Sequence, residues 1–153
     1  MNYLELKVPP LVVVLVTALA MWLVSWFLPF GAVVMPARIL FAVTLAILGA
    51  ATSVLGVVAF LRARTTVNPT KPEATSSLVS SGVYMLTRNP MYLGFLLILS
   101  GWAIFLANLV VFPLLPVFIF YMNHFQIQPE EKALTTRFGQ GFVRYTWGVR
   151  RWI

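Results

Sequence analysis

Long uncharged segments fill most of this chain and decide what it can fold into. Residues 11–28 and 39–61 form two such segments, and a third extends almost unbroken from residue 91 to residue 125. About 20 apolar residues in a helix cross a hydrocarbon core of about 30 Å, so each of the first two segments predicts one transmembrane helix. Only 10% of the residues are charged and 60% are hydrophobic, which leaves too little polar surface for a soluble domain.

The third segment is too long for one span. Asn108 near its middle predicts a turn, and two short helices at about 91–107 and 109–127 then form a tight hairpin. At 1.5 Å per residue such a helix reaches only about 25 Å, so we expect the hairpin to thin the bilayer or to stop short of one face. Pro113 and Pro116 predict a kink in the fourth helix. The sequence thus predicts an all-α integral membrane bundle of about four transmembrane helices.

The first segment raises the alternative of a cleaved signal peptide, because Ala18-Leu19-Ala20 resembles a cleavage site. The apolar stretch continues well past these residues, however, and exceeds the usual signal-peptide core of about 7–15 residues. We therefore interpret it as a retained span. The length of the chain allows one membrane domain, residues 1–153, and no separate soluble module.

Basic residues gather on one side of the expected spans. Ten of the eleven Lys and Arg residues lie there, and only Arg38 lies on the other side. The ten are Lys7, Arg62, Arg64, Lys71, Arg88, Lys132, Arg137, Arg144, Arg150 and Arg151. The positive-inside rule makes that side cytoplasmic, so both termini and a C-terminal helical segment are expected in the cytoplasm. We expect the membrane to be a bacterial inner membrane.

The net charge of +7 does not indicate nucleic-acid binding, because the basic residues flank apolar runs and form no patch of their own. Cysteine is absent and His124 is the only histidine, so the sequence predicts no disulfide, no thiol nucleophile and no metal site. Polar residues collect instead in two cytoplasmic segments, 62–90 and 128–153. The hairpin between them returns the chain to the side where it began, and an enzymatic site requires the two segments to meet.

Each polar segment contains a helix start, which is the plain structural interpretation of its residues. Asn89 and Pro90 suit the cap and the first position of the third helix. Glu130 and Glu131 suit the start of a helix, where carboxylates complement the dipole.

A polar stripe is predicted along the fourth helix. Asn123, Gln126 and Glu130 recur at spacings of three and four, provided that Pro129 does not swing the helix away. Such a stripe continues into the span and is expected to face the bundle interior or a watery cavity.

Four short motifs follow one another in the C-terminal half. Gly82-Val83-Tyr84 is followed by Arg88-Asn89-Pro90-Met91-Tyr92-Leu93-Gly94, by a hydrophobic hairpin and by Glu130-Glu131, and the tail reads Leu134-x-x-x-Phe138-Gly139-x-x-Phe142-x-x-Tyr145. In this order the motifs resemble the isoprenylcysteine carboxyl methyltransferase and phospholipid methyltransferase type. Its members carry Gly-Pro-Tyr, Arg-His-Pro-x-Tyr-x-Gly, a hairpin and a Glu-Glu pair. The resemblance covers roughly residues 65–151.

This resemblance implies a methyltransferase that binds S-adenosyl-L-methionine with residues of about 65–151, without a Rossmann fold. In agreement, the chain has no Gly-x-Gly-x-x-Gly motif. By matching position, the implied cofactor contacts are Tyr84, Arg88, Asn89, Tyr92, Glu130 and Glu131. The chain departs from the eukaryotic pattern at Asn89, where that pattern has His. Asn keeps a donor and an acceptor but lacks the titratable ring.

Methyl transfer from a sulfonium starts from an activated donor, so the work of the protein is orientation and desolvation. The faces of Tyr84 and Tyr92 are expected to hold the sulfonium by cation–π attraction. An anionic acceptor needs a basic partner, which Arg88, Arg144 or Arg150 can supply, whereas an amine acceptor needs a base. The sequence does not decide between the two.

The acceptor is expected to be a lipophilic small molecule or a lipid that arrives sideways from the surrounding membrane lipids. Gly94 and Gly101 lie on one helical face and permit close approach by another helix or by a flexible chain. We expect Gly94 to admit the acceptor, and helix packing is the stronger interpretation for Gly101. Alternatives are N-methylation of a phospholipid amine, S-methylation of a small thiol, a reductase resembling the steroid 5-alpha-reductases, and a membrane scaffold. The sequence leaves the oligomeric state undetermined.

The charge asymmetry generates a topology prediction. Cysteines introduced at Ser76 and Gln140 should react with a membrane-impermeant thiol reagent only from the cytoplasmic side, and one at Val34 only from outside. Labelling of position 76 from outside would overturn the orientation.

Overall fold

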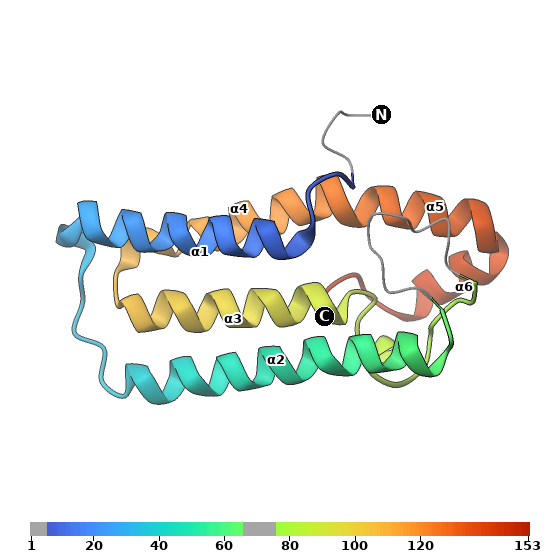
Figure 1. The fold of residues 1–153 in the computed structure, drawn as a ribbon, viewed down its shortest axis with the longest axis horizontal. Helices are drawn as coiled ribbons and strands as arrows, with labels where there is room; N and C mark the ends of the chain where they lie inside the picture. The colour runs from blue at the N-terminus through green and yellow to red at the C-terminus, as the bar shows by residue number, and fades with distance from the viewer. Residues whose placement is uncertain (1–5, 66–75) are drawn as a thin grey trace.

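The computed structural model describes residues 6–65 and 76–153, and the regular elements in these ranges are helical (Figure 1). The α-helices are α1 (Pro10–Phe27), α2 (Arg38–Arg62), α3 (Pro90–Leu106), α4 (Leu114–Tyr121), α5 (Gln128–Phe138) and α6 (Gln140–Gly148). Shorter elements are η1 (Pro29–Gly31), η3 (Gly82–Met85), η4 (Leu109–Val111) and the π-helical segment η5 (Met122–Ile127). Lys71, one of the ten expected cytoplasmic cations, lies outside the described residues, as does most of the connector before η3.

Three helical stretches are long and apolar enough to cross a membrane: α1, α2 and the continuous run Leu109–Phe138. The remaining apolar helix, α3, has 17 residues. Large apolar side chains on α1 and α2, such as Trp26 and Ile47, are exposed, as lipid-facing residues are. The predicted all-α membrane bundle is confirmed.

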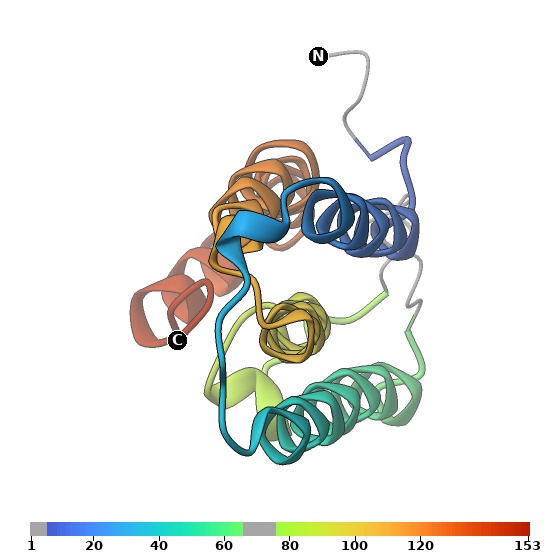
Figure 2. The same cartoon turned by 90° about the vertical axis from the view of Figure 1, so that its left-hand side faces the viewer.

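The short helix α3 lies at the centre of the bundle. Viewed along the bundle, α2 lies on one side of α3, and α1 and α4 lie on the other (Figure 2). Met21 of α1, Leu99 of α3 and Phe118 of α4 are fully buried in the core that these helices share. The Trp102 indole N–H also donates to the Ala18 carbonyl across the interface of α3 and α1 at 3.1 Å.

The turn predicted at Asn108 is present. The Asn108 side chain accepts from the backbone N–H of Val110 at 2.9 Å and donates to the Leu28 carbonyl at 2.9 Å, so it caps η4 and ties this turn to the end of α1. The predicted fourth helix is interrupted next to Pro113, because η4 ends at Val111 and α4 begins at Leu114. Pro113 precedes α4 and Pro116 lies in its first turn, where the backbone N–H groups have no partner within the helix.

The fourth helix continues past the expected end at residue 127. Pro129 has no N–H to donate to the Phe125 carbonyl four residues earlier, and its ring crowds that carbonyl. The backbone widens over η5, just before the proline, and the Leu6 N–H donates to the Phe125 carbonyl at 3.1 Å. The helix therefore continues to Phe138, and the Phe125 carbonyl has a hydrogen-bond partner from outside the helix.

Backbone contacts hold α2 against α3. The buried residues of α2 are Ala42, Gly49 and Gly56, which recur every seven residues and form one stripe. A Cβ built on Gly101 would lie 2.7 Å from the Ala42 carbonyl oxygen, and one on Gly94 would overlap the Gly49 carbonyl. The expectation that Gly94 admits the acceptor is therefore wrong. The backbone of α2 fills that space, so both glycines of α3 serve helix packing.

This packing predicts that Gly94→Ala lowers thermal stability in detergent. The added methyl group cannot fit against α2 without moving it, which costs about 1–3 kcal/mol. Gly141→Ala is the matched control, because it lies in α6 with open space around its Cβ position and should be neutral or slightly stabilising. Equal melting temperatures for the two variants would contradict the close contact.

Candidate active site

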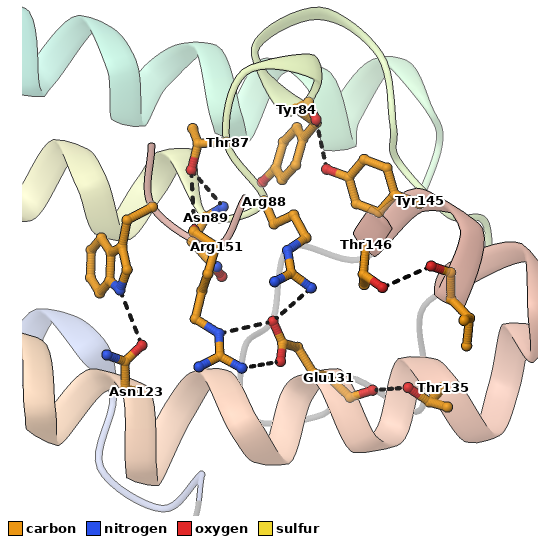
Figure 3. Close-up of polar contacts among 12 residues, drawn as sticks. Tyr84, Thr87, Arg88, Asn89, Asn123, Glu131, Thr135, Tyr145, Thr146 and Arg151 are labelled. Atoms are coloured by element: carbon orange, nitrogen blue, oxygen red, sulfur yellow. Dashed lines mark hydrogen bonds and ion pairs between the residues drawn. The ribbon is translucent and has the colours of Figure 1, made fainter. Parts of the chain in front are cut away.

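The two polar segments meet at one end of the bundle, as the sequence predicted. Figure 3 shows the loop before α3, the start of α5, helix α6 and the segment 149–153 converging there. The segment 149–153, called the tail segment below, runs back from α6 toward the start of α3 (Figure 1).

Glu131 lies at the centre of this cluster and binds two arginines. The Arg151 Nη2 and Nε atoms contact its two carboxylate oxygens at 2.6 and 3.2 Å, which is a two-pronged contact. Arg88 Nη1 lies 3.1 Å from Glu131 Oε1, the oxygen that Arg151 Nε also contacts. Side-chain exposure is 15% for Arg88, 20% for Glu131 and 32% for Arg151. Arg88, Glu131 and Arg151 taken together therefore carry a net positive charge in a half-buried place, where they favour an anionic group.

The Arg88 guanidinium keeps an unused donor. Its Nε atom is buried and has no hydrogen-bond partner among the described residues. A buried N–H without a partner is unfavourable by about 1–3 kcal/mol unless a ligand or water accepts from it. This atom is therefore a candidate donor to an anionic ligand group.

A second carboxylate lies beside the first. The hydroxyl of Tyr92, in the first turn of α3, donates to Glu130 Oε1. The Tyr92 side chain is buried, with 4% exposure, so this bond links the start of α5 to the interior of the bundle. Glu130 and Glu131 thus have different partners despite being neighbours: Glu130 faces a neutral phenol and Glu131 faces two cations.

Tyr84 and Tyr145 connect η3 to α6. The Tyr145 hydroxyl donates to the Tyr84 carbonyl at 2.6 Å, and the Tyr84 ring packs edge-on against Phe60 at the end of α2. Burial raises the pKa of the Tyr84 phenol well above its ordinary value, and burial raises the pKa of Tyr145 to about 12. Both phenols are therefore neutral at physiological pH.

Asn89 holds the tail segment. Its Nδ2 atom donates to the Arg151 carbonyl at 2.9 Å, and the Thr87 hydroxyl donates to the same carbonyl at 3.3 Å. The expected cap of α3 by the Asn89 side chain is absent, because that side chain is turned to the tail segment. The Arg88 backbone N–H donates to the Arg150 carbonyl at 3.0 Å.

The predicted polar stripe does not form one face. Asn123 accepts from the Trp152 indole at 3.1 Å, Gln126 donates to the Val8 carbonyl at 2.8 Å, and Glu130 accepts from Tyr92. The wide turns of η5 change the residue spacing within the helix, so these three side chains reach different elements.

Arg144 and Arg150, two of the basic residues proposed for an anionic acceptor, have exposed side chains, whereas Arg88 lies in the cluster. Sequence reasoning missed Arg151, which it counted only as a cytoplasmic charge. The backbone at Val149 is extended, and successive side chains of an extended segment point to opposite sides. Of two adjacent arginines, one therefore faces the site and the other faces away, and the sequence alone did not show which.

A groove of about 670 Å³ runs beside the cluster along α5 and opens to the surface. Its lining residues are Gln128, Glu131, Lys132, Thr135, Thr136 and Arg151. The ion-pair cluster is therefore reachable from outside the bundle.

A family model described as phospholipid methyltransferase matches residues 37–141, more than half of the chain. The chain belongs to the phospholipid methyltransferase family. The matched region includes Tyr84, the Arg88–Tyr92 motif and the Glu130-Glu131 pair, and the tail segment follows it. Together with the helical bundle, this membership makes the chain a membrane methyltransferase, and the predicted resemblance is confirmed.

Two relatives are similar to parts of the chain. An uncharacterized protein of Haemophilus influenzae is 43% identical over 63 residues, which is 41% of this chain and 100% of that protein. The protein-S-isoprenylcysteine O-methyltransferase of Saccharomyces cerevisiae is 40% identical over 80 residues, which is 50% of this chain and 32% of the yeast enzyme. The similarity thus spans about a third of the yeast enzyme. No solved structure gives a significant match to the chain.

The bond between Tyr145 and Tyr84 generates a prediction with a pH dependence. Tyr145→Phe removes the hydroxyl that donates a hydrogen bond to the Tyr84 carbonyl, which should lower stability by about 1 kcal/mol. Because the folded-state pKa of Tyr145 is raised from 10.0 to about 12, its contribution is complete below pH 10 and is lost as the pH rises through 12. Thermal unfolding between pH 9 and about 12 should therefore show a shallower loss of stability in the variant. Parallel profiles for variant and wild type would contradict the assignment.

Proposed function

We propose that this membrane methyltransferase takes its methyl group from S-adenosylmethionine and transfers it to a lipophilic acceptor at the cytoplasmic face of the membrane. The observation that carries the proposal is the cluster at the start of α3. Two carboxylates, two guanidinium groups and three neutral phenols meet there at the ends of apolar helices.

The residues present fit the charges of this cofactor. The buried Arg88 Nε has no partner among the described residues and suits the cofactor carboxylate. Glu130, beside Tyr92, suits the ammonium group, and the neutral rings of Tyr84 and Tyr92 suit the sulfonium. Both oxygens of Glu131 already contact arginines. We therefore assign Tyr84, Arg88, Tyr92 and Glu130 to cofactor contact, and Glu131 and Asn89 to holding Arg88 and the tail segment.

When bound, the cofactor supplies an activated methyl group on a sulfonium. This methyl carbon would pass to an oxygen, nitrogen or sulfur atom of the acceptor as the carbon–sulfur bond breaks, and S-adenosylhomocysteine would leave. The contribution of the chain is to orient the two reactants and to exclude water, because the donor needs no acid catalyst. For an anionic acceptor, the exposed Arg144 of α6 remains a candidate to receive it, whereas Arg150 is exposed and faces away from the cluster.

The acceptor class follows from the surroundings of the site. The cluster lies at the end of apolar helices whose outer faces are lipid-facing, which favours a lipophilic small molecule or a lipid. The yeast relative is named for O-methylation of protein S-isoprenylcysteine, and the family for phospholipids. We propose a carboxylate-bearing isoprenylcysteine-like acceptor first, and a phospholipid amine or a small thiol as the alternatives. The excess of basic residues at this end supports a cytoplasmic site, with both termini on the cytoplasmic side of a bacterial inner membrane.

The direct test is incubation of the purified protein with methyl-labelled S-adenosylmethionine and lipid extract, followed by identification of the labelled product. A base-labile methyl ester indicates a carboxylate acceptor, and a labelled headgroup indicates a phospholipid amine. Binding of S-adenosylhomocysteine is measured in parallel by calorimetry. A protein that binds a nicotinamide dinucleotide phosphate instead, or neither ligand, would refute the proposal in favour of a reductase or a scaffold.

Glu130→Gln provides the residue-level prediction. Loss of the carboxylate should weaken S-adenosylhomocysteine binding by about tenfold or more, the usual worth of a hydrogen bond to a charged group. Helix stability should change by only a few tenths to 1 kcal/mol, the dipole effect. Arg137→Gln, which removes an exposed charge from the same helix, serves as control. Unaltered affinity in Glu130→Gln would remove Glu130 from the site.

A further inference from the structure

The tail segment holds both the backbone and the side chain of Arg88. The Arg88 backbone N–H donates to the Arg150 carbonyl at 3.0 Å, and its guanidinium contacts Glu131, which Arg151 holds in turn. The neighbouring Thr87 and Asn89 side chains both donate to the Arg151 carbonyl. Residues more than 60 positions apart thus form one connected unit, drawn together in Figure 3.

The contacts within this unit are divided unequally. Arg151 uses two nitrogen atoms on Glu131, Nη2 at 2.6 Å and Nε at 3.2 Å. Arg88 uses one, Nη1 at 3.1 Å, and its Nε stays without a partner among the described residues. A carboxylate and a guanidinium prefer two parallel contacts. Arg151 has taken that arrangement with Glu131, and Arg88 is left with a single contact.

We propose that Arg151 is a positioning residue of the methyl-donor site: by occupying Glu131 it keeps the Arg88 guanidinium available to the carboxylate of the cofactor. Without Arg151, Glu131 is free to form a two-pronged pair with Arg88, which consumes the Nε donor. The local charge then falls, because one guanidinium instead of two faces the Glu131 carboxylate. This inference rests on the proposed function, because it assumes that Arg88 receives the cofactor.

The side chain at position 151 must be a guanidinium for this role. Lysine keeps the positive charge but has one nitrogen, so it cannot engage both oxygens of Glu131 in the same fixed geometry. Arg151→Lys therefore separates the geometric effect from the charge effect, and Arg151→Gln removes both.

The test measures S-adenosylhomocysteine affinity by calorimetry in wild type, Arg151→Gln, Arg151→Lys, Glu131→Gln and the double variant Arg151→Gln/Glu131→Gln. We expect Arg151→Gln and Arg151→Lys each to weaken binding by about tenfold or more. Glu131→Gln should reverse most of that loss in the Arg151→Gln background, because a neutral amide competes poorly for Arg88. The exposed Arg137→Gln should bind like wild type.

A second ligand separates positioning from a general structural role. Methylthioadenosine has the same nucleoside but lacks the amino-acid carboxylate, so its affinity should be the same in wild type and in Arg151→Gln. Equal weakening of both ligands, or a double variant that binds no better than Arg151→Gln, would show that Arg151 only supports the fold. An Arg151→Gln affinity within twofold of wild type would also overturn the inference. A wild-type protein that binds no S-adenosylhomocysteine would refute the proposed function itself.

Discussion

The contact between the backbones of α2 and α3 fixes the position of the residues at the end of the bundle where the candidate site lies. Ser53 of α2 donates to the Met91 carbonyl at 3.2 Å, and a Cβ on Gly56 would lie 2.8 Å from Met91 Cγ, so the first turn of α3 has no freedom to slide. In lipid there is no hydrophobic driving force between helices, so van der Waals contacts at closely packed small residues supply the attraction. Arg88 and Asn89 directly precede this fixed turn and Tyr92 lies within it, so the turn sets the position of all three.

The other half of the site depends on a proline that the helix tolerates. Pro129 would end or kink most helices, but here the chain widens over η5 and the Phe125 carbonyl is satisfied by the Leu6 N–H. The helix then continues in one direction from the membrane into α5, which carries Glu130 and Glu131 to the level where α3 begins. A rigid extension of a span is a better support for a reactive site than a loop, because its side chains keep one geometry.

Much of the fold could be predicted from the sequence, because lipid imposes simple rules. The lengths of the uncharged runs predicted the helices, and Asn108 predicted the turn. Because a hairpin returns the chain to the side where it began, the sequence also predicted that the two polar segments meet. The errors have one common cause, which is tertiary context. Gly94 has the same sequence signature whether a ligand or a helix approaches it. The spacing of Asn123, Gln126 and Glu130 indicates a stripe only if the helix is regular. The Asn89 side chain can cap a helix or hold a distant carbonyl, and the inward side of the Arg150-Arg151 pair depends on how the tail segment lies.

The long sequence separation between the two halves of the site also has a consequence for biosynthesis. Thr87 and Asn89 donate to the Arg151 carbonyl, which lies 64 and 62 residues further along the chain and is synthesised later. At about 5–20 residues per second, a ribosome needs roughly 3–13 seconds to make that stretch. During this interval α1, α2 and α3 can already enter the bilayer, while Arg88 still lacks the residues that hold it. A nascent chain can therefore insert before the polar cluster exists, and a chain that stalls before residue 150 reaches the membrane without an assembled cluster.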